Sequence, residues 1–180
     1  MSGKRSSMIA ERRLLTMDFV QAEATVGTAT RRTASVRPVD KGVGVLHCLV
    51  ASAQATRQRL LAKSAKQWGW ETTICGDPAD AERTVAQMCT QLAFVDLEGE
   101  QGAGFQPLVR QLADQRQVLL VVCGNEQDGA EEVWARQLGV WFYLPGISEG
   151  NTIGLLCRDA RSIVSERLKA ADRGRSVATS

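Results

Sequence analysis

The stretch LAFVDLEGEQGAGF, Leu92 to Phe105, decides the fold class of this chain. A short apolar run ends in one acid, Asp96, and a polar loop with three glycines leads to Phe105, where a helical pattern begins. A buried strand that passes through a loop into a helix is the repeating unit of α/β proteins. Because an acid is costly to place at the end of a buried strand, Asp96 is the first candidate functional residue.

The same alternation of strand and helix continues on both sides of this stretch. Short apolar runs predict five strands, at 45–51, 72–75, 92–97, 118–124 and 140–144. Apolar residues at helical spacing, together with capping and breaking residues, predict helices at 56–68, 78–88, 105–112, 131–138 and 151–169. Strands that are apolar throughout are buried on both faces, so we expect an α/β fold with a five-stranded, doubly wound parallel sheet.

Charge divides the 180-residue chain into three regions. Residues 1–41 hold eight Lys and Arg against four acids, a net charge of +4, whereas residues 42–170 hold twelve against fifteen, a net charge of −3. We therefore expect a basic, flexible N-terminal tail at 1–41, with a short amphipathic helix at 8–20. One globular domain is expected at 42–170, followed by a flexible C-terminal tail at 171–180.

The cysteines, the single histidine and the hydropathy of the chain limit which cellular locations and cofactors we expect. The five cysteines form no CxxC pair, and the single histidine, His47, does not supply a zinc-binding set. We expect reduced thiols that pack as small core residues in a cytoplasmic protein. No apolar run approaches the length of a membrane span, and the N-terminus is a poor secretory signal, so we expect no membrane contact and no bound cofactor.

The carboxyl ends of the predicted strands are where ligand chemistry gathers in a parallel sheet. From Val45 to Lys169, the order and spacing of the segments resemble the receiver domain of bacterial response regulators, a CheY-like (βα)5 fold of the receiver/flavodoxin type. TRQRLLAKSAKQWGWE resembles the first helix of a receiver, and GDPADAERTVAQM resembles the second. LAFVD resembles the strand that ends in the phosphorylated aspartate, and GVWFYL resembles the segment that opens the fifth strand.

The resemblance implies which residues a working receiver needs, and most of them are missing here. A receiver holds Mg²⁺ with two acids after its first strand, where this chain has Ala51 and Ser52. Its Ser or Thr after the fourth strand matches Cys123, and its Lys after the fifth strand falls near Gly146. Only Asp96, the equivalent of the phosphoacceptor, remains. With no cation to offset a phosphoryl group, we expect a degenerate pseudo-receiver in which Asp96 is a structural acid bonded to backbone N–H groups.

These observations favour a non-catalytic regulatory or scaffolding module that acts independently of phosphorylation. Such a module would bind a protein partner, with a homodimer as one form of that contact. Exposed aromatic side chains would mark the interface, and the candidates are Trp134, Trp141, Phe142 and Tyr143, on the helix and strand that form the usual partner face of receivers. The alternative is that these residues are covered by the final helix.

Three other hypotheses stay open. A stand-alone response regulator phosphorylated on Asp96 in two-component signalling would bind Mg²⁺, whereas the first hypothesis predicts no Mg²⁺ binding. A flavodoxin-like enzyme or small-ligand binder would use the same strand ends, but the carboxylate pairs and the glycine-rich phosphate loop that would support it are missing. The basic tail at 1–41 would bind nucleic acid only through salt-sensitive contacts without sequence preference.

Overall fold

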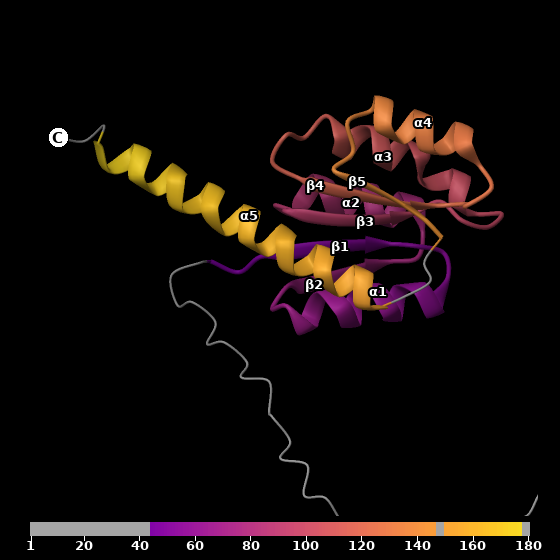
Figure 1. Cartoon of the computed structure of the whole chain (residues 1–180), viewed down its shortest axis with the longest axis horizontal. Coiled ribbons are helices and arrows are strands. Elements are labelled where there is room, and N and C mark those ends of the chain that lie inside the picture. Colours follow the sequence, from indigo (N-terminus) through magenta and orange to yellow (C-terminus); the bar gives the residue numbers. More distant parts are fainter. Residues whose placement is uncertain (1–43, 147–149, 178–180) are drawn as a thin grey trace, which may run out of the picture. The chain divides into compact units, whose positions relative to one another are not determined.

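The computed structural model describes the backbone of residues 44–146 and 150–177, with side chains up to residue 173. Within these residues, strands and helices alternate and build one sheet with helices on both faces (Figure 1). The elements are β1 (His47–Ala51), α1 (Ala55–Gln67), β2 (Glu71–Cys75), α2 (Pro78–Gln87), β3 (Leu92–Asp96), a 3₁₀ helix η1 (Gly102–Phe105), α3 (Gln106–Ala113), β4 (Leu119–Gly124), α4 (Gly129–Gln137), β5 (Phe142–Pro145) and α5 (Gly150–Val177). The predicted tail at 1–41, its helix at 8–20 and its nucleic-acid contact lie outside the described residues.

The sheet of the described residues has five parallel strands in the order β2-β1-β3-β4-β5. This confirms the predicted fold class, a doubly wound α/β sheet. Every residue of β3 and β4 is buried, because helices cover both faces of these inner strands. Asp96 at the end of β3 is in register with Cys123 near the end of β4, so the chemistry-bearing ends of these strands meet at one edge of the sheet.

Alternate residues of each strand face two separate hydrophobic layers. On β1, Cys48 and Val50 face the layer that α1 and α5 cover, and Leu49 and Ala51 face the layer that α2, α3 and α4 cover. We call these the α1–α5 layer and the α2–α4 layer. The two helices of the first layer lie against each other. The strand period of two therefore decides which side chains can reach α1 and which cannot.

Local turn chemistry sets several of the helix ends. The carboxylate of Asp77 accepts hydrogen bonds from the backbone N–H groups of Ala79 and Asp80, and Pro78 opens α2, as the sequence predicts. After α1, Gly69 adopts a φ of +73°, a left-handed conformation that favours glycine. These local signals explain why the predicted boundaries of α1 and α2 are close to the observed ones.

Two boundaries differ from the predictions by more than two residues. The chain forms η1 before α3, and a Cβ at Gly102 would lie 1.9 Å from the carbonyl oxygen of Leu97, so this turn requires glycine. Helix α5 continues to Val177, and the predicted C-terminal tail at 171–180 therefore begins inside the helix. The described side chains of residues 166–173 are exposed, so this part of α5 is not packed into the hydrophobic core.

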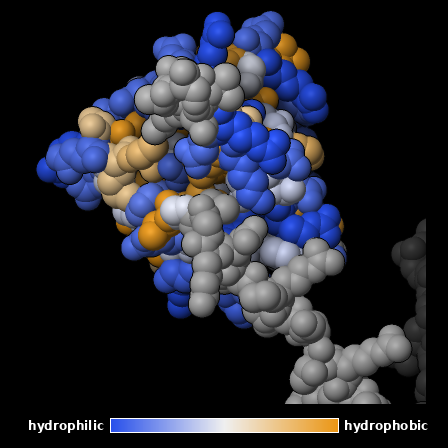
Figure 2. Space-filling view, turned by 90° about the vertical axis from the view of Figure 1, so that its left-hand side faces the viewer, coloured by the Kyte–Doolittle hydropathy of each residue, from blue (hydrophilic) through white to orange (hydrophobic). Residues whose placement is uncertain are grey.

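The side of the molecule toward which α5 extends has a mixed surface. Figure 2 views the molecule from this side, and hydrophobic residues lie there as separate patches among hydrophilic ones. Leu168 is one of the apolar residues of α5 that remain exposed, at 39%. Although α5 has 28 residues, no helix in the described part of the chain is long and apolar enough to cross a membrane.

Candidate functional site

Asp96 is buried at the end of β3, and its side chain is 0% exposed. Both oxygens of its carboxylate accept hydrogen bonds. The hydroxyl of Ser52 donates to Oδ2 at 2.7 Å, while Nη1 of Arg57 and the backbone N–H of Glu98 donate to Oδ1 at 2.9 and 3.2 Å. A buried carboxylate is stable only when it is paired and hydrogen-bonded, and Asp96 meets both conditions.

The cation of this site is Arg57, in the first turn of α1. Its guanidinium bridges two acids, with Nη1 bound to Asp96 and Nη2 bound to Oε2 of Glu98. The side chain of Arg57 is only 15% exposed, so the pair with Asp96 is largely shielded from water. The expectation that nothing offsets the charge at this strand end is therefore wrong, because Arg57, 39 positions earlier in the chain, supplies the positive charge.

Arg57 was not among the predicted site residues, although one signal in the sequence points to it. A positive charge in the first turn of a helix opposes the helix dipole, and the first turn of α1 contains no acid. An arginine in such a position is stabilised by a carboxylate from elsewhere in the fold. The search for a cation after the fifth strand, where receivers carry lysine, does not find it, because this cation comes from α1.

The turn between β1 and α1 is tied to the loop after β3 by a small polar network around Ser52. The Ser52 hydroxyl accepts from the backbone N–H of Gln54 at 3.0 Å, and the Ser52 carbonyl accepts from the Gln58 amide at 2.6 Å. The Gln54 amide in turn donates to the carbonyl of Glu98 at 3.2 Å. These contacts hold Ser52 and Glu98 in place around Asp96, so the site is a set of mutually supporting hydrogen bonds.

Two other predicted pocket positions, Ala51 and Cys123, have different surroundings. Ala51 packs in the α2–α4 layer and is not part of the network around Asp96. Cys123 lies beside Asp96 in the sheet register. Burial raises the pKa of the Cys123 thiol well above its ordinary value, and the Asp96 carboxylate raises it further. Cys123 therefore stays a neutral, packed thiol and offers a phosphoryl group only a weak donor.

Gly146 is the position where receivers carry a lysine. Its backbone conformation disfavours any residue with a side chain. Its φ is +68°, and its N–H donates to the carbonyl of Gly124 at 2.8 Å. A Cβ there would lie 2.6 Å from Oε1 of Glu126. A non-glycine residue in this left-handed conformation would cost roughly 1 kcal/mol or more. The local backbone and the missing lysine are thus consistent with each other.

The residues around Asp96 do not fit a magnesium ion. Mg²⁺ requires oxygen ligands in octahedral geometry, with carboxylates and waters among them. Here the Asp96 carboxylate is already bound by a guanidinium and a hydroxyl, and Arg57 would repel a dication. In residues 44–146 and 150–177, no group of three or more His, Cys, Asp or Glu is arranged to hold a metal ion.

The aromatic side chains predicted at an interface differ in exposure. Phe142 on β5 is 43% exposed, and the half-buried Trp141 packs edge-on against it with ring centroids 6.4 Å apart. Trp134 on α4 is half-buried, and the guanidinium of Arg110 lies 5.9 Å from the centre of its ring. Tyr143 does not fit the predicted surface, because its side chain is buried in the α2–α4 layer.

Tyr143 instead links β5 to α4 from inside. Its hydroxyl donates to Oε1 of Glu131 at 2.9 Å and lies 3.4 Å from the carbonyl oxygen of Asn125. Burial raises the pKa of Tyr143, and its hydrogen bond to Glu131 raises it further. Gly124 makes room for the pair, since a Cβ there would lie 1.9 Å from Oε1 of Glu131 and 2.2 Å from the Tyr143 hydroxyl oxygen. Sequence patterns did not indicate this cluster.

Solved structures of receiver domains share this fold. The chain aligns with NtrX from Brucella abortus, crystallised in complex with ADP, at a TM-score of 0.59 and 16% identity, over 72% of this chain and 30% of that one. It aligns with a CheY-like receiver domain protein from Methanospirillum hungatei at a TM-score of 0.57 and 12% identity, over 71% and 99% of the two chains. A Burkholderia pseudomallei response regulator with a phosphorylated aspartic acid, calcium ion and citrate aligns at 0.55 and 19% identity, over 68% and 72%.

These comparisons define the class of fold. The described part of the chain has the α/β sheet and the surrounding helices of a CheY-like receiver domain. The chain spans less than a third of the NtrX chain it matches, at 30%. No family model and no curated protein matches the sequence.

Proposed function

We propose that this chain is a receiver-fold module that regulates or scaffolds by binding another protein, without catalysis and without phosphorylation. The observation that carries this proposal is the buried pair of Asp96 and Arg57. A phosphoacceptor must present a free oxygen to the donor, with a cation placed to receive the developing charge. Here both carboxylate oxygens of Asp96 already accept hydrogen bonds, from Ser52, Arg57 and the Glu98 N–H. The positive charge of Arg57 neutralises Asp96 itself and is not free to stabilise a phosphoryl group.

The charge balance supports the same proposal. The site now holds Asp96 and Glu98 at −1 each and Arg57 at +1, a net charge of −1. A phosphoryl group on Asp96 would replace one negative charge by about two, for a net of about −2 at a buried strand end. Without a dication, only protein groups could stabilise that extra charge. The position where receivers carry a lysine is Gly146 in this chain. Phosphorylation at Asp96 is thus disfavoured by both geometry and charge.

A titration with magnesium and beryllofluoride, a mimic of the phosphoryl group, tests this proposal. We expect amide NMR signals around Asp96, Cys123 and Gly146 to stay unchanged at millimolar magnesium. Shifts that occur in the natural chain and vanish in Asp96→Asn would overturn the proposal and would support a stand-alone response regulator phosphorylated on Asp96. A dispersed spectrum of Asp96→Asn shows that the control is folded.

We further propose that α4 and β5 carry the surface that contacts a partner, and that the partner is a second copy of this chain. The support is a set of apolar side chains on these two elements and the residue before β5: Val133, 55% exposed, and Phe142, 43% exposed, with the half-buried Trp134 and Trp141. Large apolar side chains that are exposed on neighbouring elements are typical of surfaces that contact other proteins, and α4 lies next to β5. We refer to these four residues as the aromatic surface.

Light scattering after size-exclusion chromatography tests the homodimer. We expect the natural chain to elute as a dimer and Phe142→Ser to shift it toward monomer. Ile74→Ser on β2, the opposite edge strand of the sheet, is the matched control, because Ile74 has the same exposed fraction of 43%. A monomeric natural chain, or equal effects of the two substitutions, would contradict the proposed homodimer.

A further inference from the structure

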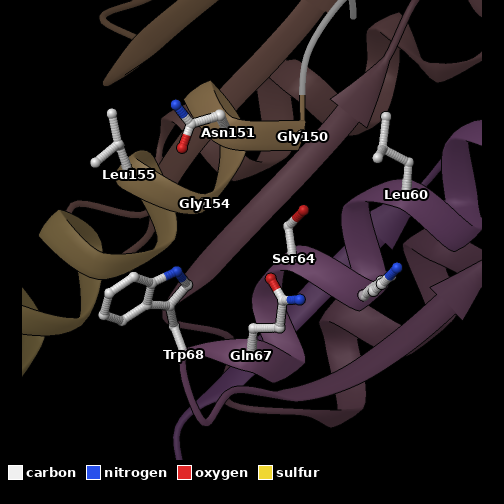
Figure 3. A pocket seen from close by; sticks show the side chains of 9 residues that line it. Leu60, Ser64, Gln67, Trp68, Gly150, Asn151, Gly154 and Leu155 are labelled. Carbon is white, nitrogen blue, oxygen red and sulfur yellow. The ribbon is translucent and has the colours of Figure 1, made fainter. Parts of the chain in front are cut away.

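Helices α1 and α5 border a pocket that is separate from the Asp96 network. Its volume is about 380 Å³, within the range of roughly 300–1,000 Å³ that small-molecule sites occupy. Figure 3 shows side chains of both helices pointing into it. The lining residues are Leu60, Lys63, Ser64, Gln67, Trp68, Gly150, Asn151, Gly154 and Leu155.

The two ends of the pocket are apolar. Trp68 and Leu155 lie at one end and Leu60 at the other (Figure 3). Trp68 is 37% exposed and Leu155 is 43% exposed, so both present apolar surface that the fold itself does not cover. Gly154 of α5 lies beside the ring, because a Cβ there would be in van der Waals contact with Nε1 of Trp68 at 3.4 Å. The pocket therefore offers an aromatic face and room for a flat apolar body beside it.

Ser64 places a hydroxyl group in the same pocket. Its side chain is only 4% exposed, and its hydroxyl has no hydrogen-bond partner among the described residues. Figure 3 shows this hydroxyl directed toward the first turn of α5, and the Ser64 oxygen lies 4.0 Å from the position of a Cβ at Gly150. The hydroxyl opens into the pocket, so an oxygen ligand can accept or donate a hydrogen bond there in place of water.

The electrostatics of the pocket favour a negative ligand. Lys63 is the only charged residue among the described residues that line it. Helix α5 begins at Gly150, which lines the pocket, so the positive end of its dipole lies at the border of this space. The amides of Gln67 and Asn151 add hydrogen-bonding groups at the rim. Each of these groups suits a carboxylate, and Trp68 suits an aromatic ring.

We propose that the pocket between α1 and α5 is a binding site for small aromatic carboxylates. The carboxylate binds beside Ser64, Lys63 and the start of α5, and the ring packs against Trp68 and Leu155. This site does not share a residue with the Asp96 network, so its test stands apart from that of phosphorylation.

Indole-3-carboxylate and its neutral analogue indole-3-carboxamide are suitable probes, followed by amide and indole NMR signals of the full chain. We expect saturable shifts at Ser64, the Trp68 indole N–H and Gly154, with a Kd of about 1 mM or tighter for the carboxylate. The amide should bind about fivefold more weakly, because it lacks the charge that Lys63 and the helix end favour. Absence of saturable shifts, or shifts away from these residues, would overturn the proposal.

Three substitutions sharpen the result. Gly154→Leu fills the pocket and should abolish saturable binding, whereas Ser162→Leu, at an exposed position of the same helix, should leave it unchanged. Lys63→Met removes only an exposed charge, and should weaken the carboxylate about twofold to threefold without changing the amide. Unchanged carboxylate binding in a folded Gly154→Leu, or in Lys63→Met, would refute the site. Lys63→Met also keeps the test decisive if Gly154→Leu does not fold.

Discussion

Replacing Arg57 by methionine removes the cation of a buried ion pair while keeping most of the side-chain volume. The side chain of Asp96 is 0% exposed and that of Arg57 is 15% exposed, so water cannot readily take the place of the guanidinium. Removing one partner of a buried pair costs about 3–5 kcal/mol. Asp96 would keep its hydrogen bonds from Ser52 and the Glu98 N–H, so we expect the lower end, about 3 kcal/mol less free energy of unfolding.

The loss of the Glu98 contact should add little to this effect. The side chain of Glu98 is 36% exposed, and partly exposed pairs contribute under about 1 kcal/mol. A loss of 3 kcal/mol in a domain of this size should lower the melting temperature by roughly 10–15 °C. Urea unfolding followed by circular dichroism measures the free energy, and a thermal scan gives the melting temperature.

Arg59→Met is the matched control for this prediction. Arg59 lies on the same helix, is exposed, and donates only to the carbonyl of Ala55 at 3.1 Å. Its replacement should change the free energy of unfolding by no more than about 0.5 kcal/mol. The control separates loss of the buried pair from a general effect of removing positive charge from α1.

A double-mutant cycle with Asp96→Asn decides whether the pair itself is responsible. Because Asn needs no counter-charge, the double variant should be about 2 kcal/mol more stable than the sum of the two single effects predicts. A change in Arg57→Met no larger than that of Arg59→Met would refute the reasoning. Additive effects in the cycle would refute it as well, because they would show that Asp96 and Arg57 do not interact energetically.

Three further predictions concern the hydrogen bonds and thiols of the domain. Ser52→Ala leaves Oδ2 of Asp96 without its donor and should cost about 2 kcal/mol in urea unfolding; a loss under about 0.5 kcal/mol would contradict the buried bond. Tyr143→Phe should cost about 1 kcal/mol. Folding raises the Tyr143 pKa, so its contribution is complete below about pH 10 and lost as pH rises further, and this alkaline loss should be smaller in Tyr143→Phe. Of the five cysteines, all within the described residues, only Cys89 is exposed, so a thiol reagent should modify one site quickly in the native protein and none in Cys89→Ser.

The fold could be predicted because its signals are local. The apolar run that ends at Asp96 and the Asp77-Pro78 cap are properties of neighbouring residues. Strand and helix boundaries therefore fall within a few residues of the predicted ones. The end of α5 was missed because helix propensity continues there without a hydrophobic face that would mark it. The turn at η1 was missed because the close approach of Gly102 to Leu97 is a tertiary contact.

The candidate site could be predicted only in part. Asp96, Ser52 and Cys123 follow from topology, because the carboxyl ends of parallel strands must share one edge of the sheet. Ala51 was expected beside them, but the strand alternation turns it to the other layer. The sequence could not predict that Tyr143 points inward and bonds Glu131. Strand alternation allows any of the three consecutive aromatic residues at 141–143 to be the buried one.

Arg57 shows what the sequence determines by itself and what only the tertiary structure decides. Periodicity and capping place it in the first turn of a helix after β1, and they assign Asp96 to the end of a buried strand. That the two charges meet at 2.9 Å depends on how α1 docks on the sheet and on the reach of the arginine side chain. The hydrophobic patterns of strands and helices repeat every two or 3.6 residues, so they can be read from residues that are close in the sequence. A contact across 39 positions is decided only when packing brings the two segments together.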